Sequence, residues 1–142
     1  MTTKHKLINP LPIEFDEETH RYIWTPTNEI MANSVTSITG FDMPESKRKS
    51  IEQFKHIWAP RGTAVHKALE LFLLHKSLDY DYKYDDWIQP LLQHQYFQEF
   101  FKPLAVEYRV VDLKNSIGGT LDAYGIDTRT NKKVLMDLKT QS

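Results

Sequence analysis

The stretch GTAVHKALELFLLHK (62–76) constrains the fold more than any other part of the sequence. Val65, Ala68, Leu69, Phe72 and Leu73 recur at the spacing that places side chains on one face of an α-helix. A face this apolar is stable only when a sheet or another helix covers it. The sequence therefore predicts a helix here that lies against the core of the protein.

The segments before and after this helix predict an α+β fold. After about residue 104 the chain alternates between strand-like segments and turns, whereas most of the segments before it are helical. The predicted strands are AVEYRVVDL, GTLDAYGI and VLMDLK, separated by the turns NSIGG and DTRTNKK. Three other helices are predicted. The first, NSVTSITGF, is capped by Asn33 or Ser34 and ends at Gly40, and the second, PESKRKSIEQFKHIWAP, ends at Pro60. The third covers DDWIQPLLQHQYFQEFFKPL. Two short strands, HRYIW and EIMA, precede them. Helices followed by three consecutive strands favour an antiparallel meander packed against helices.

The length of 142 residues and the 40% hydrophobic content fit a single domain. We expect an N-terminal hairpin region over 1–33, a helical part over 34–104 and a group of strands over 105–142. The sequence contains no cysteine, which excludes disulfides, thiolate metal sites and iron–sulfur clusters. A metal would have to be held by carboxylates, histidine and carbonyls, a ligand set that suits Mg²⁺ or Mn²⁺ better than structural zinc. No apolar run has signal-peptide or transmembrane length, so we expect a cytoplasmic protein, bacterial or phage-encoded.

The charge is unevenly distributed along a chain whose net charge is only −1. The segment ESKRKSIEQFKHIWAPR is rich in lysine and arginine, and DYDYKYDD holds four aspartates. Each cluster, taken alone, is typical of a solvated surface. The overall charge argues against a protein that binds nucleic acid through its whole surface.

The last predicted strand carries two charged residues on one face. Asp137 and Lys139 are two positions apart, so they project to the same side about 7 Å from each other. If the strands pair through DTRTNKK, Asp122 faces Asp137 with the backbones about 5 Å apart. Two such carboxylates either share a proton or bind a divalent cation. A nearby lysine can orient or deprotonate a metal-bound water. The alternative is a polar sheet face that meets solvent.

Further candidate residues lie upstream. His66 and Glu70 are four positions apart on one flank of the predicted helix, where they could point to a site or simply pair with each other. Glu107 alternates away from its apolar neighbours and could reach the same site or remain an exposed glutamate. Gly118 and Gly119 indicate either a bulge or close backbone approach, or a plain hairpin start.

Taken together, these segments resemble the PD-(D/E)XK nuclease superfamily. The resemblance is closest to its histidine-containing branch, the RecB-like exonucleases and their phage and mitochondrial relatives. It rests on RGTAVHKALE, on the glutamate of AVEYRVV, on GGTLDAYG and on MDLKT. HRYIWTPTNEIMANSVTSITG is similar to the segment before the helix in phage members, so the likeness runs from about His20 to Thr140. The proline of the family name is absent, because Leu121 precedes Asp122.

The resemblance implies a restriction-endonuclease-like core and a metal-dependent DNA nuclease. The expected activity is that of an exonuclease in DNA repair, recombination or phage DNA processing, acting on single-stranded DNA or a double-stranded end. It also implies roles for individual residues. His66, Asp122, Asp137 and the Leu138 carbonyl would bind Mg²⁺ or Mn²⁺; Asp122, Asp137, Lys139 and Glu107 would be catalytic; Glu70 would support His66; and Lys47, Arg48, Lys49 and Arg61 would contact DNA phosphates.

Family members usually continue past the lysine into a further helix and further strands. Because this sequence stops at Ser142, we expect the C-terminal part of the fold to be missing and the last strand to form an exposed edge. Such an edge favours homo-oligomers. A second hypothesis is a nuclease-fold domain without activity that binds nucleic acid or a protein partner.

Overall fold

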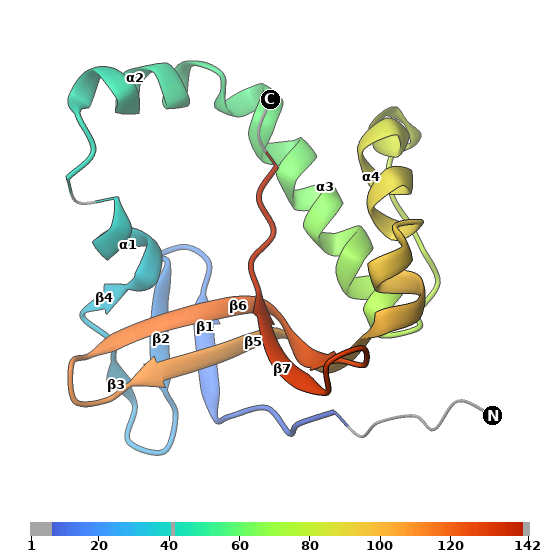
Figure 1. Cartoon of the computed structure of the whole chain (residues 1–142). Helices are drawn as coiled ribbons and strands as arrows, with labels where there is room; N and C mark the ends of the chain where they lie inside the picture. The colour runs from blue at the N-terminus through green and yellow to red at the C-terminus, as the bar shows by residue number, and fades with distance from the viewer. Residues whose placement is uncertain (1–6, 41, 141–142) are drawn as a thin grey trace.

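The computed structural model describes residues 7–40 and 42–140, and their arrangement confirms a mixed α+β fold (Figure 1). Residues 1–6, Phe41, Gln141 and Ser142, which include both ends of the predicted domain, lie outside the described residues. The strands are β1 (Ile13–Asp16), β2 (Arg21–Trp24), β3 (Glu29–Ile30), β4 (Asn33–Ser34), β5 (Phe101–Asp112), β6 (Ile117–Asp127) and β7 (Lys132–Met136). The helices are α1 (Val35–Thr39), α2 (Glu45–Gln53), α3 (Lys55–Leu73) and α4 (Asp85–Leu92), with a 3₁₀ turn η1 (Tyr82–Tyr84) and a π-helical turn η2 (Tyr96–Phe100).

The N-terminal region forms a three-stranded antiparallel sheet in the order β1-β2-β3. The predicted hairpin is confirmed as β2 and β3, whose turn contains Asn28 at a positive φ of 57°. Asparagine is one of the residues that tolerate this left-handed conformation. The sequence analysis did not predict β1.

The second sheet is built around β6. The predicted meander is confirmed, because β5 and β7 each pair with β6 in antiparallel fashion. Since β5 occupies one edge of β6 along its whole length, β7 and the short parallel strand β4 must share the other edge. β4 ends at Ser34, the partner of Gly118, and β7 ends at Met136, the partner of Ala123. Within the described chain, the four residues of β6 between these points have no ladder partner on that edge, and Asp122 is one of them.

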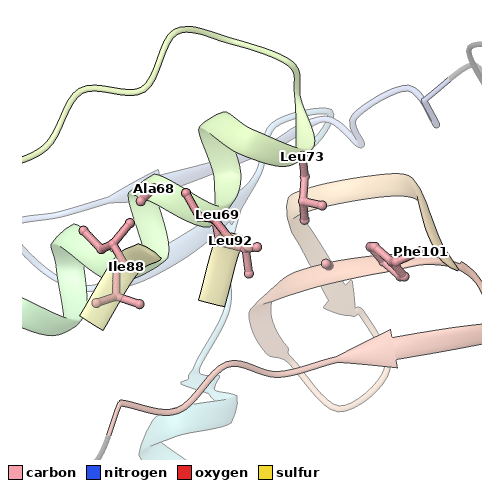
Figure 2. Packing of buried hydrophobic residues seen from close by; sticks show 8 residues of the cluster. Ala68, Leu69, Leu73, Ile88, Leu92 and Phe101 are labelled. Atoms are coloured by element: carbon pink, nitrogen blue, oxygen red, sulfur yellow. The ribbon is translucent and has the colours of Figure 1, made fainter. Parts of the chain in front are cut away.

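The main core lies where α3 and α4 pack on the second sheet (Figure 2). The predicted helix face is confirmed, because Val65, Ala68, Leu69 and Leu73 are all buried. Ile88 of α4 is fully buried against this face, and Ala123 contributes the β6 side. A second cluster joins the two sheets through Ile13, Tyr22 and Met31. In the described part of the chain, no helix combines the length and apolar character needed to cross a membrane.

The predicted end of the second helix at Pro60 is wrong. Helix α2 ends at Gln53, Phe54 breaks the helical geometry with φ −104° and ψ 9°, and α3 then runs through Pro60. Proline costs a helix one backbone hydrogen bond, and this loss is smallest close to the N-terminus. Pro60 lies in the second turn of α3, so the apolar face beyond it outweighs the local penalty.

The last predicted helix also ends too late. Helix α4 stops at Leu92, and β5 begins at Phe101, four residues before the expected start of the strands. Pro103 disfavours a helical conformation of the residue before it. Phe101 is buried against the rings of Tyr96 and Phe97, which fixes the chain in an extended conformation at this point.

The structure decides between the two residues predicted to cap the first helix. Ser34 caps α1, since its hydroxyl accepts from the Ser37 amide at 3.1 Å, and Gly40 ends the helix.

The structure also shows the role of the two adjacent glycines of β6. Gly118 and Gly119 pair with β5 in continuous register, and a Cβ at Gly118 would lie 2.5 Å from the Tyr22 ring. The glycines therefore allow close approach of the protein's own side chains. The register shift of β5 lies elsewhere, between Pro103 and Ala105.

Gly125→Ala should destabilise the protein by about 1–3 kcal/mol, because overpacking displaces backbone or core side chains. A Cβ at Gly125 would overlap the Lys102 carbonyl oxygen and lie 2.8 Å from the Phe101 ring. Gly40→Ala is the matched control, since among the described residues its Cβ would meet the Thr36 carbonyl alone, at 3.3 Å. Urea denaturation of the two variants measures the difference. Equal free energies of unfolding would contradict the close β5–β6 packing at Gly125.

Candidate functional site

Asp122 lies at the point where β7 separates from β6. β7 pairs with β6 in the register predicted from the turn, and this register, extended by one step beyond the Ala123–Met136 pair, would set Asp137 opposite Asp122. The ladder stops at Met136, and the Leu138 amide instead donates a 2.6 Å hydrogen bond to Asp122 Oδ2. The carboxylate thus binds the backbone of the segment that leaves the sheet. In Figure 1 this segment rises from β7 along the first half of α3.

His66 reaches the same point from α3. Its Nδ1 lies 2.8 Å from the Gly62 carbonyl oxygen of its own helix. Its Nε2 lies 2.9 Å from the Leu138 carbonyl oxygen and 3.5 Å from Asp122 Oδ2. The helix, the central strand and the outgoing segment therefore each contribute one group to a single cluster.

The two ring nitrogens of His66 face two carbonyl oxygens, which a neutral imidazole cannot satisfy at once. A neutral ring carries one N–H, whereas carbonyl oxygens only accept. If Nδ1 donates to Gly62, the lone pair of Nε2 faces the lone pairs of the Leu138 carbonyl at 2.9 Å. Only a second proton or a cation can make this contact favourable. A doubly protonated ring or a cation at Nε2 would satisfy both contacts, whereas a neutral Nε2–H ring satisfies only the Leu138 contact.

Glu107 completes the cluster from β5. Its neighbours pair with Ala123 and Leu121, which places Glu107 opposite Asp122. Its φ of 48° is unusual for a glutamate, and such strain costs on the order of 1 kcal/mol. Burial first, and then the charges of Asp122 and Glu70, raise the pKa of Glu107 to about 7. A hydrogen bond with Asp122 acts in the same direction.

Asp137 and Lys139 lie on the solvent side of this cluster. Lys139 Nζ is 3.1 Å from Asp137 Oδ2, and this bond is the main cause of the lowered pKa of Asp137. A hydrogen bond with Asp122 lowers it further, so the two predicted carboxylates do approach each other. Both side chains of the ion pair are about 70% exposed, and a pair in such a position adds little to stability.

The predicted metal ligands are assembled in part. In the described ranges 7–40 and 42–140, no three histidine, cysteine, aspartate or glutamate side chains are placed so that they could hold one ion. The partial set of His66, Asp122 and the Leu138 carbonyl does fit a hard cation. Neighbouring ligands of octahedral Mg²⁺ lie about 3 Å apart, as bond lengths of about 2.1 Å at right angles require. The distances of 2.9 and 3.5 Å from His66 Nε2 are close to this value.

Glu70 has a partner other than the predicted one. Glu70 was expected to support His66, but it binds Lys67 Nζ at 3.2 Å, and Nδ1 of His66 contacts the Gly62 carbonyl instead. Its charge still affects the site, because it contributes to the raised pKa of Glu107.

A cavity of about 650 Å³ adjoins Glu107 and Glu70. Its other walls are the N-terminal segment from Leu7 to Leu11, part of β1, and residues of α3, β5 and β6 that include Lys67 and Thr120. The sequence analysis missed this cavity. The only signal was the unusual apolar content of LINPLPIEF before the first strand.

The predicted DNA-contacting residues have different environments. Lys47 and Lys49 are exposed on α2, a helix that in Figure 1 extends away from both sheets and none of whose described residues is buried. Arg48 instead donates to the Gly40 and Met43 carbonyls at 2.5 and 3.2 Å. Arg61 lies over the Trp87 ring at 4.1 Å, and among the described side chains its Nε is buried without a hydrogen-bond partner.

Comparison with known proteins adds no family to this description. No family model matches the chain, and no similar chain is found among the curated proteins or the solved structures.

Glu107→Gln should flatten the pH dependence of stability. The raised pKa means that the folded state holds this proton more tightly than the unfolded state. The stabilisation is therefore complete below the unfolded pKa and disappears as the pH rises through about 7. Between about pH 5 and pH 8, the free energy of unfolding of the wild type should fall by about 1–2 kcal/mol more than that of Glu107→Gln, with the partial exposure of the side chain taken into account.

Urea unfolding in EDTA at the two pH values provides the measurement. Glu29 is an exposed glutamate of β3, and Glu29→Gln is the control. Its free energy of unfolding should change with pH as much as that of the wild type. If the free energy of unfolding of Glu107→Gln changed with pH as much as that of the wild type, the environment described for this carboxyl group would be contradicted.

Proposed function

We propose that this chain is a metal-dependent DNA nuclease with a restriction-endonuclease-like core. One observation carries the proposal: His66 Nε2 and the Leu138 carbonyl oxygen face each other at 2.9 Å beside the Asp122 carboxylate. One imidazole, one carboxylate and one carbonyl form a set of ligands that suits Mg²⁺ or Mn²⁺. A neutral histidine can donate to only one of the Gly62 and Leu138 carbonyls, and a cation bound at Nε2 would leave Nδ1 free to donate to Gly62.

The residues around this point match the needs of phosphodiester hydrolysis. A divalent cation polarises a phosphoryl oxygen and makes hydroxide available near neutral pH. His66, Asp122 and Leu138 would hold the cation. Lys139, exposed beside them, would orient the attacking water or offset charge that develops on the phosphate. Glu107, with a pKa of about 7, can hold or release a proton next to Asp122.

The arrangement of elements supports the same proposal. The histidine is on α3, the upstream glutamate on β5, and the two aspartates at the end of the β6–β7 pair, which is the order of the motifs in the resembling family. Lys47 and Lys49 present positive charge on the outer helix α2, where they would contact DNA phosphates. An exonuclease of repair, recombination or phage DNA processing is the preferred form of this function.

A second candidate is a domain of the same fold that binds nucleic acid without cutting it. The ion pair between Asp137 and Lys139 favours this alternative, because it engages the two residues that catalysis would require. The absence of a three-side-chain metal group among the described residues points the same way.

Digestion of labelled DNA separates these candidates. Loss of linear DNA, but not of circular DNA, with Mn²⁺ or Mg²⁺ and not with EDTA is the expected result for an exonuclease. Lys139→Ala should lower the cleavage rate by about 100-fold or more, since a positioned group of this kind contributes that much to proton transfer. Lys133→Ala, an exposed lysine of β7, should cleave at the wild-type rate. Binding without cleavage in every metal would favour the second candidate.

Metal binding can be measured independently of cleavage. His66→Ala should weaken Mn²⁺ binding in calorimetry by about tenfold or more, because the imidazole is one of few ligands. Lys139→Ala should leave Mn²⁺ affinity nearly unchanged, and His56→Ala, an exposed histidine of α3, is the control. Equal affinity of the wild type and His66→Ala would remove His66 from the metal site.

A further inference from the structure

The N-terminal segment before β1 is fixed against the second sheet. The Ile8 amide donates to the Leu104 carbonyl at 2.8 Å, and the Tyr108 hydroxyl donates to the Asn9 carbonyl at 2.7 Å. Arg109 also donates to the Ile13 carbonyl at 3.3 Å. The segment therefore has a defined position along β5, and it forms one wall of the 650 Å³ cavity beside Glu107.

The wall formed by this segment is apolar. Leu7, Ile8 and Leu11 line the cavity although they are 40%, 45% and 42% exposed. Pro10 and Phe15 extend the same wall. Exposed apolar side chains that border a cavity are typical of a surface that a ligand covers. The cavity volume is within the range of small-molecule sites.

The remaining walls include polar residues and charged residues of both signs. Glu70, Glu107 and Thr120 offer hydrogen-bonding groups, with Glu17 a further acid and with Lys67 and Arg109 as the two cations. Lys67 is already paired with Glu70 at 3.2 Å. Both cations already have partners, since Arg109 donates to the Ile13 carbonyl, which makes this cavity a poor site for a phosphate. The glutamates suit a neutral ring with amino groups, because glutamate accepts hydrogen bonds from the exocyclic amines of bases.

These features match the two surfaces of a nucleobase, which has apolar faces and a polar edge. The cavity also shares Glu70 and Glu107 with the cluster around Asp122, so a base inside it would lie next to the candidate metal ligands. We infer that the cavity binds the unpaired terminal base of a DNA strand and that segment 7–11 forms its apolar wall. This inference rests on the proposed function and specifies its substrate: a strand end whose base is unpaired.

The experiment compares single-stranded oligonucleotides that carry either a normal base or an abasic sugar at the terminal nucleotide, with each end tested in turn. The wild type should show a kcat/KM about tenfold or more higher for the normal base at one of the ends. The double variant Ile8→Ser, Leu11→Ser should lose this preference by slowing on the normal substrate and keeping its rate on the abasic one. Leu113→Ser is the matched control, because Leu113 is 46% exposed in the turn after β5, outside the cavity.

A binding measurement tests the cavity without cleavage. The fluorescence of an oligonucleotide with a terminal 2-aminopurine is recorded as the protein binds it in EDTA. A fluorescence change that depends on Ile8 and Leu11 supports base binding in the cavity, whether or not the wild type cuts DNA. If the wild type cuts no DNA, the proposed function is overturned and the base site remains. Cleavage that is equally fast with and without the terminal base overturns the inference and leaves the nuclease proposal standing. Leu11→Ser alone replaces the double variant if thermal unfolding shows that the latter does not fold.

Discussion

The bond from the Leu138 amide to the Asp122 carboxylate determines how the rest of the site is arranged. It forms where β4 and β7 leave part of β6 without a ladder partner, so a side chain takes the place of a strand. The carboxylate holds the amide of Leu138, and the carbonyl of the same residue contacts His66. Without this bond, β7 could continue along β6, and the three groups of the cluster would not meet.

The cluster is stable only because the surrounding fold is rigid. Glu107 adopts a strained backbone conformation and has a raised pKa, and both features cost free energy. The packed face of α3 against α4 and the long β5–β6 pairing offset that cost, since they fix the helix and strand that carry His66 and Glu107. Strain and a shifted pKa at the same residue are typical of functional sites.

The parts of the molecule that would meet a substrate are those with the least packing. Helix α2 presents Lys47 and Lys49 without burying any of its described residues, and the N-terminal segment leaves apolar side chains beside a cavity. Arg48 and Arg61 have partners inside the protein, which shows that a basic sequence cluster divides into structural and surface residues only after folding.

Local patterns determined a large part of this protein. The buried face of α3, the cap at Ser34, the β5–β6–β7 meander and the register that opposes Asp122 to Asp137 all follow from spacing within a few turns of chain or across one hairpin. Only the tertiary structure decided that α3 continues through Pro60, that β4 joins β6, that Glu70 binds Lys67, and that residues 7–11 form a cavity wall. These features depend on which residues distant in sequence compete for the same partner. Periodicity cannot report that competition, because it depends on the packing of the whole chain.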